Sequence, residues 1–128
     1  MSITIQVNPA SDRRFIRWLT DVLLIVNLEE RKNIDGTYNE TCEALDNIND
    51  WFVKMGHADL DVLSQGIQSA GYMLQCDVYG GAFNLLKIDE FVLLVLSQKW
   101  KRPDSVMLLI KDEEQAVFTV HKTSKPAA

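Results

Sequence analysis

Few residues in this chain have the type and spacing that catalysis or metal binding requires. Its 128 residues include two histidines, His57 and His121, and two cysteines, Cys42 and Cys76. A metal site needs several such ligands at recognisable spacing, whereas the two cysteines are separated by 33 residues and form no CxxC-type pair. A cysteine nucleophile would need a nearby histidine, which nothing in the spacing indicates. We therefore expect no metal, no cofactor and two reduced thiols.

Carboxylates are the only acid-base groups present in number. Glu43, Asp46 and Asp50 recur at helical spacing with Glu40 and Asn47 beside them, and we call these five residues the acidic ridge. An exposed helix face offers little burial to separate the pKa values of an acid and a base, so catalysis is not expected there. Like charges on one helix destabilise it by roughly 0.2–0.5 kcal/mol a pair, which favours a binding role for the ridge. An ordinary solvated helix face shows the same pattern.

Known sequence motifs give no further indication of an activity. The chain has no GxGxxG, Walker A, HExxH, GxSxG or EF-hand pattern. Its one basic cluster interleaved with an aromatic residue is 99–102, and we attribute those charges to the C-terminus of a helix, where they complement the helix dipole. We therefore expect no direct binding to nucleic acid.

Charge is spread unevenly along the sequence. Residues 1–32 have a net charge of +1, residues 33–98 of −8 and residues 99–128 of +2, which gives −5 for the chain. An acidic middle disfavours contact with a phosphate backbone and favours a partner with a basic surface. Charge of this size also serves solubility.

The composition is that of a globular protein, with 47% hydrophobic residues, three prolines and six glycines. We expect one compact domain over residues 1–128, with 123–128 a frayed tail. The longest apolar runs, 22–26 and 91–96, are far shorter than the roughly 20 residues that span a membrane. The first residues lack the pattern of a secretory signal, so we expect a cytoplasmic protein.

The most apolar stretch, residues 89–100, is predicted to be a central helix. Asp89 can cap its start and Pro103 stops it. Its apolar side chains cover nearly the whole helical circumference, which indicates burial on all sides.

Three further helices are predicted, over about 12–32, 39–55 and 59–75. The first has an apolar stripe that includes Phe15, Trp18 and Val22, while Leu24 and Leu28 fall on its outer face and could form an apolar interface. The second carries the acidic ridge and ends at Gly56. For residues 72–88 we prefer helix followed by loop, and a hairpin turning at Gly80–Gly81 is the alternative.

The strand signals lie near the two ends of the chain. Residues 2–7 alternate apolar and polar side chains, and the pattern of 105–111 with 115–122 predicts a hairpin around an acidic turn. The predicted fold is therefore α+β, with about four helices packed on a three-stranded antiparallel sheet made of the N-terminal strand and the C-terminal hairpin.

These patterns lead to three hypotheses of function. The first is a non-catalytic protein-binding module, a stoichiometric inhibitor of the toxin-immunity or phage anti-defence type, whose acidic ridge occupies a basic surface of its partner. The second is an enzyme or small-ligand domain with a pocket between sheet and helices, near His57, Cys76 and Tyr79. The third is a homo-oligomer with apolar contacts at Leu24, Leu28, Val62 and Met73.

Overall fold

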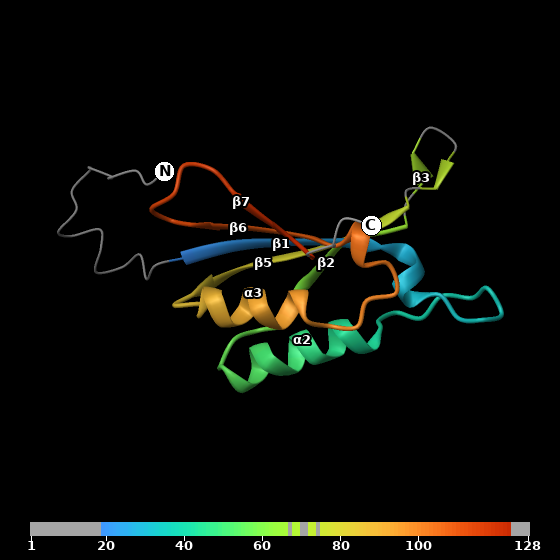
Figure 1. Ribbon diagram of the computed structural model, residues 1–128, viewed down its shortest axis with the longest axis horizontal. Helices are drawn as coiled ribbons and strands as arrows, with labels where there is room; N and C mark the ends of the chain where they lie inside the picture. The colour runs from blue at the N-terminus through green and yellow to red at the C-terminus, as the bar shows by residue number, and fades with distance from the viewer. Residues whose placement is uncertain (1–18, 67, 70–71, 74, 124–128) are drawn as a thin grey trace.

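The protein is built on a five-stranded antiparallel sheet that carries both of its described α-helices on one face (Figure 1). A computed structural model describes residues 19–66, 68–69, 72–73 and 75–123. The sheet has the order β2-β5-β1-β6-β7. Its strands are β1 (Leu19–Asn27), β2 (Asp61–Gln65), β5 (Cys76–Asn84), β6 (Met107–Asp112) and β7 (Thr119–Lys122), and β3 (Gln68–Ser69) pairs separately with β4 (Tyr72–Met73).

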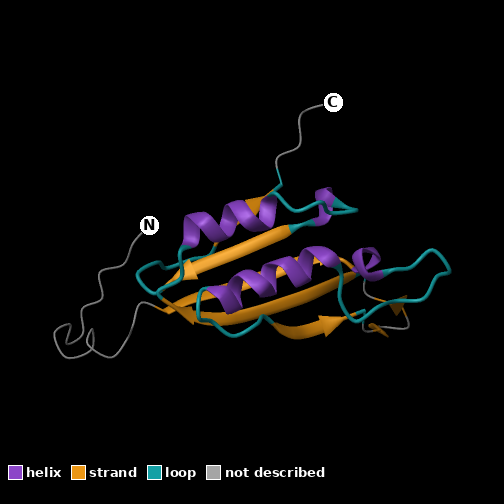
Figure 2. Ribbon diagram, turned by 90° about the horizontal axis from the view of Figure 1, so that it is seen from below, coloured by secondary structure: helices purple, strands orange, loops and turns teal. Residues whose placement is uncertain are grey.

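The helical layer consists of α2 (Glu43–Lys54) and α3 (Ile88–Leu96). Figure 2, seen from below, shows the two helices lying side by side along the strands. Two short 3-10 helices complete the described structure: η1 (Leu28–Arg31) follows β1, and η2 (Pro103–Ser105) precedes β6. This arrangement contradicts the predicted fold of about four helices on three strands, although the α+β character is retained.

The central strand β1 lies within the segment 12–32, for which the predicted helix is wrong from residue 19 onward. Val22, Leu24 and Val26 are buried towards the helices, while Leu23 and Ile25 are half-buried on the other face. A strand with apolar residues on both faces reads as a continuous apolar run, which periodicity cannot distinguish from a buried helix. The part of that predicted helix before residue 19 lies outside the described residues, as does the predicted strand 2–7.

The predicted helix over 59–75 is also wrong, because its first part forms the edge strand β2. Gly66 follows β2 with a φ of 55°, a left-handed conformation that a right-handed helix cannot contain. β2 pairs with β5 through a register shift between Val62 and Ser64. Edge pairing to β5 therefore prevails over the local helical pattern.

Gly80 and Gly81 lie in the middle of β5, so neither the helix nor the hairpin expected for 72–88 is formed. A Cβ at Gly80 would meet the carbonyl oxygen of Val22 at 2.9 Å, and one at Gly81 would meet the Phe83 ring at 2.8 Å. These glycines therefore permit close packing within and onto the sheet rather than a turn.

The helices attach to the sheet mainly through aromatic rings. Phe52 of α2 stacks on Phe83 of β5 with ring centroids 4.4 Å apart, and it lies 5.0 Å from Phe91 of α3. Phe91 and Val95 are the buried residues of α3, whereas Leu93 is 69% exposed. The segment 89–100 does contain the predicted helix, but the prediction of burial on all sides is wrong.

Two other sequence predictions are confirmed. The helix expected over 39–55 is α2, and the C-terminal hairpin is formed by β6 and β7, which pair from Met107 opposite Lys122 to Ile110 opposite Thr119. Within the part of the chain that the structure describes, neither α-helix is long and apolar enough to cross a membrane.

Candidate protein-binding surface

The acidic ridge lies on the outer face of α2. One face of α2 is buried against the sheet and α3 and consists of Ala44, Leu45, Ile48 and Phe52. The opposite face of the helix is directed outward. All five ridge residues are exposed: Glu40, Glu43, Asp46, Asn47 and Asp50. Sequence spacing therefore placed this group of side chains correctly, with Glu40 in the loop just before the helix.

The start of α2 accommodates part of this negative charge. Glu43 and Asp46 occupy its first turn, where free backbone N–H groups and the helix dipole favour carboxylates. The N-cap residue is Cys42, whose side chain makes no capping hydrogen bond, and the hydroxyl of Thr41 instead donates to the Asp46 carboxylate at 2.9 Å. Asp50 lies beyond the first turn and lacks this compensation.

No ridge carboxylate is paired with a cation within the described residues. The ion pairs of Arg31 with Asp77 and of Arg102 with Glu29 lie outside the ridge. The negative charges on the outer face of α2 are therefore accessible to a partner.

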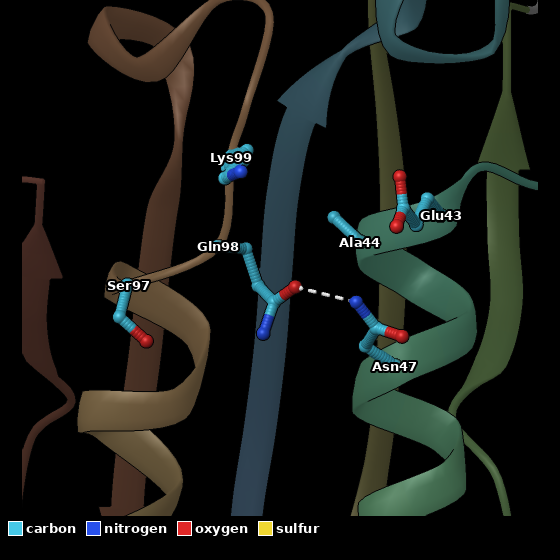
Figure 3. Close-up of a pocket in the computed structure, with 6 residues that line it drawn as sticks. All are labelled: Glu43, Ala44, Asn47, Ser97, Gln98 and Lys99. Carbon is cyan, nitrogen blue, oxygen red and sulfur yellow. Dashed lines mark hydrogen bonds between the residues drawn. The ribbon is translucent and has the colours of Figure 1, made fainter.

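A pocket lies between the start of α2 and the segment that follows α3. Its volume is ≈220 Å³, and it is lined by Glu43, Ala44, Asn47, Ser97, Gln98 and Lys99 (Figure 3). The side-chain amide of Asn47 donates to Gln98 Oε1 at 3.0 Å, which connects the two walls. Two ridge residues, Glu43 and Asn47, thus also line this pocket.

A second contact joins the end of α2 to the start of α3. The indole N–H of Trp51 donates to Glu90 Oε2 at 3.0 Å, and the Trp51 ring lies 5.5 Å from that of Phe91. The two cross-links join the start of α2 to the end of α3 and the end of α2 to the start of α3, so the helices are antiparallel. Trp51 is half-buried between them.

The predicted apolar interface at Leu24 and Leu28 does not exist at the surface. Leu24 points from the centre of β1 towards the helices, Leu28 begins η1, and both are buried within this chain. They were placed on an outer face because a helical period of 3.6 was applied to a strand, in which side chains alternate instead. Val62 is exposed, and the side chain of Met73 is outside the described residues.

The residues of the predicted ligand pocket are not brought together. His57 packs on the rings of Phe52 and Phe83 at the end of α2. Tyr79 faces the helices from β5, and Cys76 points to the opposite face of the same strand. Among the described residues no group of three or more histidine, cysteine or carboxylate side chains is placed to hold a metal ion.

Cys42, at the N-cap of α2, is poorly suited to act as a nucleophile. Burial raises the pKa of its thiol, and the charge of Glu30 adds to that increase, against the opposing effect of backbone N–H groups at the helix start. The thiol is therefore protonated at neutral pH.

A buried ion pair that no local sequence pattern indicates joins η1 to β5. Arg31 donates to both carboxylate oxygens of Asp77, at 2.6 and 3.1 Å, and to the carbonyl of Asn39 at 2.7 Å. The hydrogen bond to Asp77 raises the pKa of Arg31. Tyr79 lies 3.4 Å from Asp77 Oδ2 and accepts a hydrogen bond from Gln65, and burial raises its pKa to about 12. These groups are occupied with one another, so their role is structural.

Glu30 is a second buried acid with a structural role. Its carboxylate accepts hydrogen bonds from the backbone N–H groups of Lys101 and Arg102, at 2.9 and 2.7 Å. The ammonium of Lys101 also donates to the Lys32 carbonyl at 2.8 Å. The basic cluster at 99–102 therefore lies beyond the end of α3, and its Lys101 and Arg102 fasten this loop to η1 rather than completing a helix.

No protein-family model, curated protein or solved structure matches this chain.

Proposed function

We propose that this chain is a non-catalytic, cytoplasmic protein-binding module, a stoichiometric inhibitor of the toxin-immunity or phage anti-defence type. Its acidic ridge contacts a basic surface of the partner and occupies it. The observation that carries this proposal is the position of the ridge: its residues are exposed on the outer face of α2, and its carboxylates have no cationic partner within the described chain.

The distribution of charge supports the same face. Segments 40–60 and 85–99, which contain the two helices and their adjoining loops, hold seven acidic and three basic side chains, all exposed. The rest of the sequence holds eleven acidic and ten basic side chains, so four of the five net negative charges originate in these segments. An unbalanced acidic face accelerates encounter with a basic partner and disfavours acidic ones.

The side chains that could take part in catalysis are used in structural contacts instead, which supports a binding role. Arg31, Asp77 and Tyr79 hold η1 onto β5, Glu30 holds the 99–102 loop, and the pKa of Cys42 is raised. The hydrogen bonds of Arg31, Asp77, Tyr79 and Glu30 stabilise the scaffold that presents α2, and the protonated thiol of Cys42 is a poor nucleophile.

The test is affinity capture from the native host with three forms of the chain. Glu43→Lys with Asp50→Lys reverses the ridge, and Asp59→Lys with Asp61→Lys reverses two exposed acids after α2 as a matched control. We expect the wild type and the control to retain one stoichiometric partner, and the ridge variant to lose it. Equal retention by the ridge variant, with an unchanged circular dichroism spectrum, would refute the proposal.

A further inference from the structure

The face of the sheet that is turned away from α2 and α3 carries a broad apolar surface. Residues paired across neighbouring antiparallel strands point to the same face, and alternate residues of one strand point to opposite faces. Because Val22 and Leu24 are buried towards the helices, Leu23 and the residues in line with it across the sheet point the other way. We call the following apolar residues the outer sheet face: Leu23 and Ile25 of β1, Val78, Gly80 and Ala82 of β5, Met107 and Leu109 of β6, and Val120 of β7.

Gly80 keeps the centre of the outer sheet face flat. A Cβ at this position would lie 2.9 Å from Leu63 Cδ1 and 3.0 Å from Leu23 Cδ2, so the side chains from β2 and β1 approach each other over the glycine. Leu63 therefore extends the apolar surface onto β2, and it is 55% exposed. Figure 1 shows α2 and α3 on one side of the sheet, and no described α-helix covers the other side. An exposed apolar surface that extends over several strands marks an interaction site.

The outer sheet face is large enough for a stable dimer. In the sheet order, its five strands contain 5, 9, 9, 6 and 4 residues. At about 3.3 Å per residue and about 4.8 Å between strands, they cover roughly 500 Å² on one copy and roughly 1,000 Å² on two. A specific interface needs about 1,000 Å² in total, so face-to-face packing of two sheets reaches that size.

The charges around this face favour a second copy of the chain as its occupant. Four charged strand residues border it: Asp21, Asp61, Lys111 and Lys122. Their charges cancel, whereas the segments 40–60 and 85–99 on the helical side hold a net charge of −4. Two copies, each with a net charge of −5, therefore meet with least repulsion when their outer sheet faces approach and their helices point apart.

We propose that two copies of this chain pack outer sheet face against outer sheet face, related by a two-fold axis along β1. Because β1 is the central strand, this axis places β2 of each copy over β7 of the other. Asp61 then lies near Lys122 of the second copy, and Leu63 near its Val120. Both acidic ridges stay exposed on the outside of the dimer, so the inference goes beyond the proposed function and does not depend on it.

The test is the molar mass of the full chain, measured by light scattering over a range of concentrations. We expect the wild type to have the mass of two chains. Leu63→Lys with Val120→Lys brings four lysines into the interface and should raise the dissociation constant of the dimer at least about ten-fold. Val53→Lys with Leu93→Lys makes the same change at two exposed apolar residues of the helices, and this matched control should remain a dimer.

Several results would overturn the inference. A wild type with the mass of one chain at every concentration would assign the outer sheet face to another part of the chain or to another protein. A dimer that is retained by Leu63→Lys with Val120→Lys, or lost in the helix variant, would place the contact elsewhere. Circular dichroism checks that each variant is folded. If the lysine variant is not, Leu63→Ser with Val120→Ser replaces it, with the same expected rise in the dissociation constant.

Discussion

The carboxylate of Asp77 is fully buried, and its charge is balanced by the fork of hydrogen bonds from Arg31. Burying two charges is costly, and only good geometry with further hydrogen bonds offsets that cost. Here the Asn39 carbonyl satisfies another guanidinium N–H, and the Tyr79 hydroxyl lies within reach of the carboxylate. The ion pair thus fixes where the chain leaves η1, and through the next loop it fixes where α2 begins.

Removing one partner of this pair should lower the free energy of unfolding far more than replacing both partners with apolar residues. Arg31→Met leaves Asp77 buried without a counter-charge and should lower the free energy of unfolding by about 3–5 kcal/mol. Arg31→Met combined with Asp77→Leu should recover part of that loss. Urea unfolding of the single and double variants measures it, and a single variant within about 1 kcal/mol of wild type would show that the pair is not buried as described.

Tyr79 gives the fold a dependence on alkaline pH. Its pKa is about 12 in the folded chain, above the ordinary value of about 10 for an unfolded tyrosine, so folding favours the protonated phenol. This stabilising contribution is complete below pH 10 and is lost as the pH rises through 12. The loss is about 2–3 kcal/mol from a shift of this size. In Tyr79→Phe the free energy of unfolding should fall less between pH 10 and 12 than in the wild type, by that amount. Urea unfolding at each pH measures both proteins, and identical pH profiles would contradict the assignment to Tyr79.

At the scale of elements, α3 divides sharply into a buried and an exposed side. Phe91→Ala removes a fully buried ring and should cost about 3–5 kcal/mol, whereas Leu93→Ala changes an exposed side chain and should stay within about 0.5 kcal/mol. Thermal denaturation of the two variants compares them directly. A large loss for Leu93→Ala would restore the idea of a helix buried on all sides.

The elements that could be predicted from sequence were those whose pattern had one interpretation. α2 has a narrow apolar stripe and a polar outer face, and β6 with β7 flank an acidic turn, so both were found. β1 and β5 were missed because central strands with apolar or small residues on both faces lose the period of two. The ridge was found because it lies on α2, whereas the apolar surface at Leu93 depends on how α3 packs.

The partners of the buried polar groups could not be predicted from the sequence either. Arg31 and Asp77 are 46 residues apart, and Glu30 binds backbone N–H groups more than 70 residues away. No local pattern encodes such pairs, because they arise only when the strand order brings η1, β5 and the 99–102 loop together. Residue types alone show that Arg31, Asp77 and Glu30 are charged, but not which groups they bind.

At the scale of the whole molecule, the sheet carries a helical layer that holds most of the net charge of the chain. The two helices lie on one face, and segments 40–60 and 85–99, which contain them, account for −4 of the net −5. A module of this kind should bind a basic partner in a salt-sensitive manner, because long-range attraction between exposed charges is screened within about 10 Å at 0.1 M salt.

The dissociation constant of the captured partner at low and high salt tests this account most directly. For the wild type and for Asp59→Lys with Asp61→Lys, we expect affinity to fall steeply as salt increases. For Glu43→Lys with Asp50→Lys, we expect affinity at least about ten-fold lower at low salt, with little further loss at high salt. Full affinity and an unchanged salt dependence in the ridge variant would contradict the central claim that the face of α2 is the binding surface.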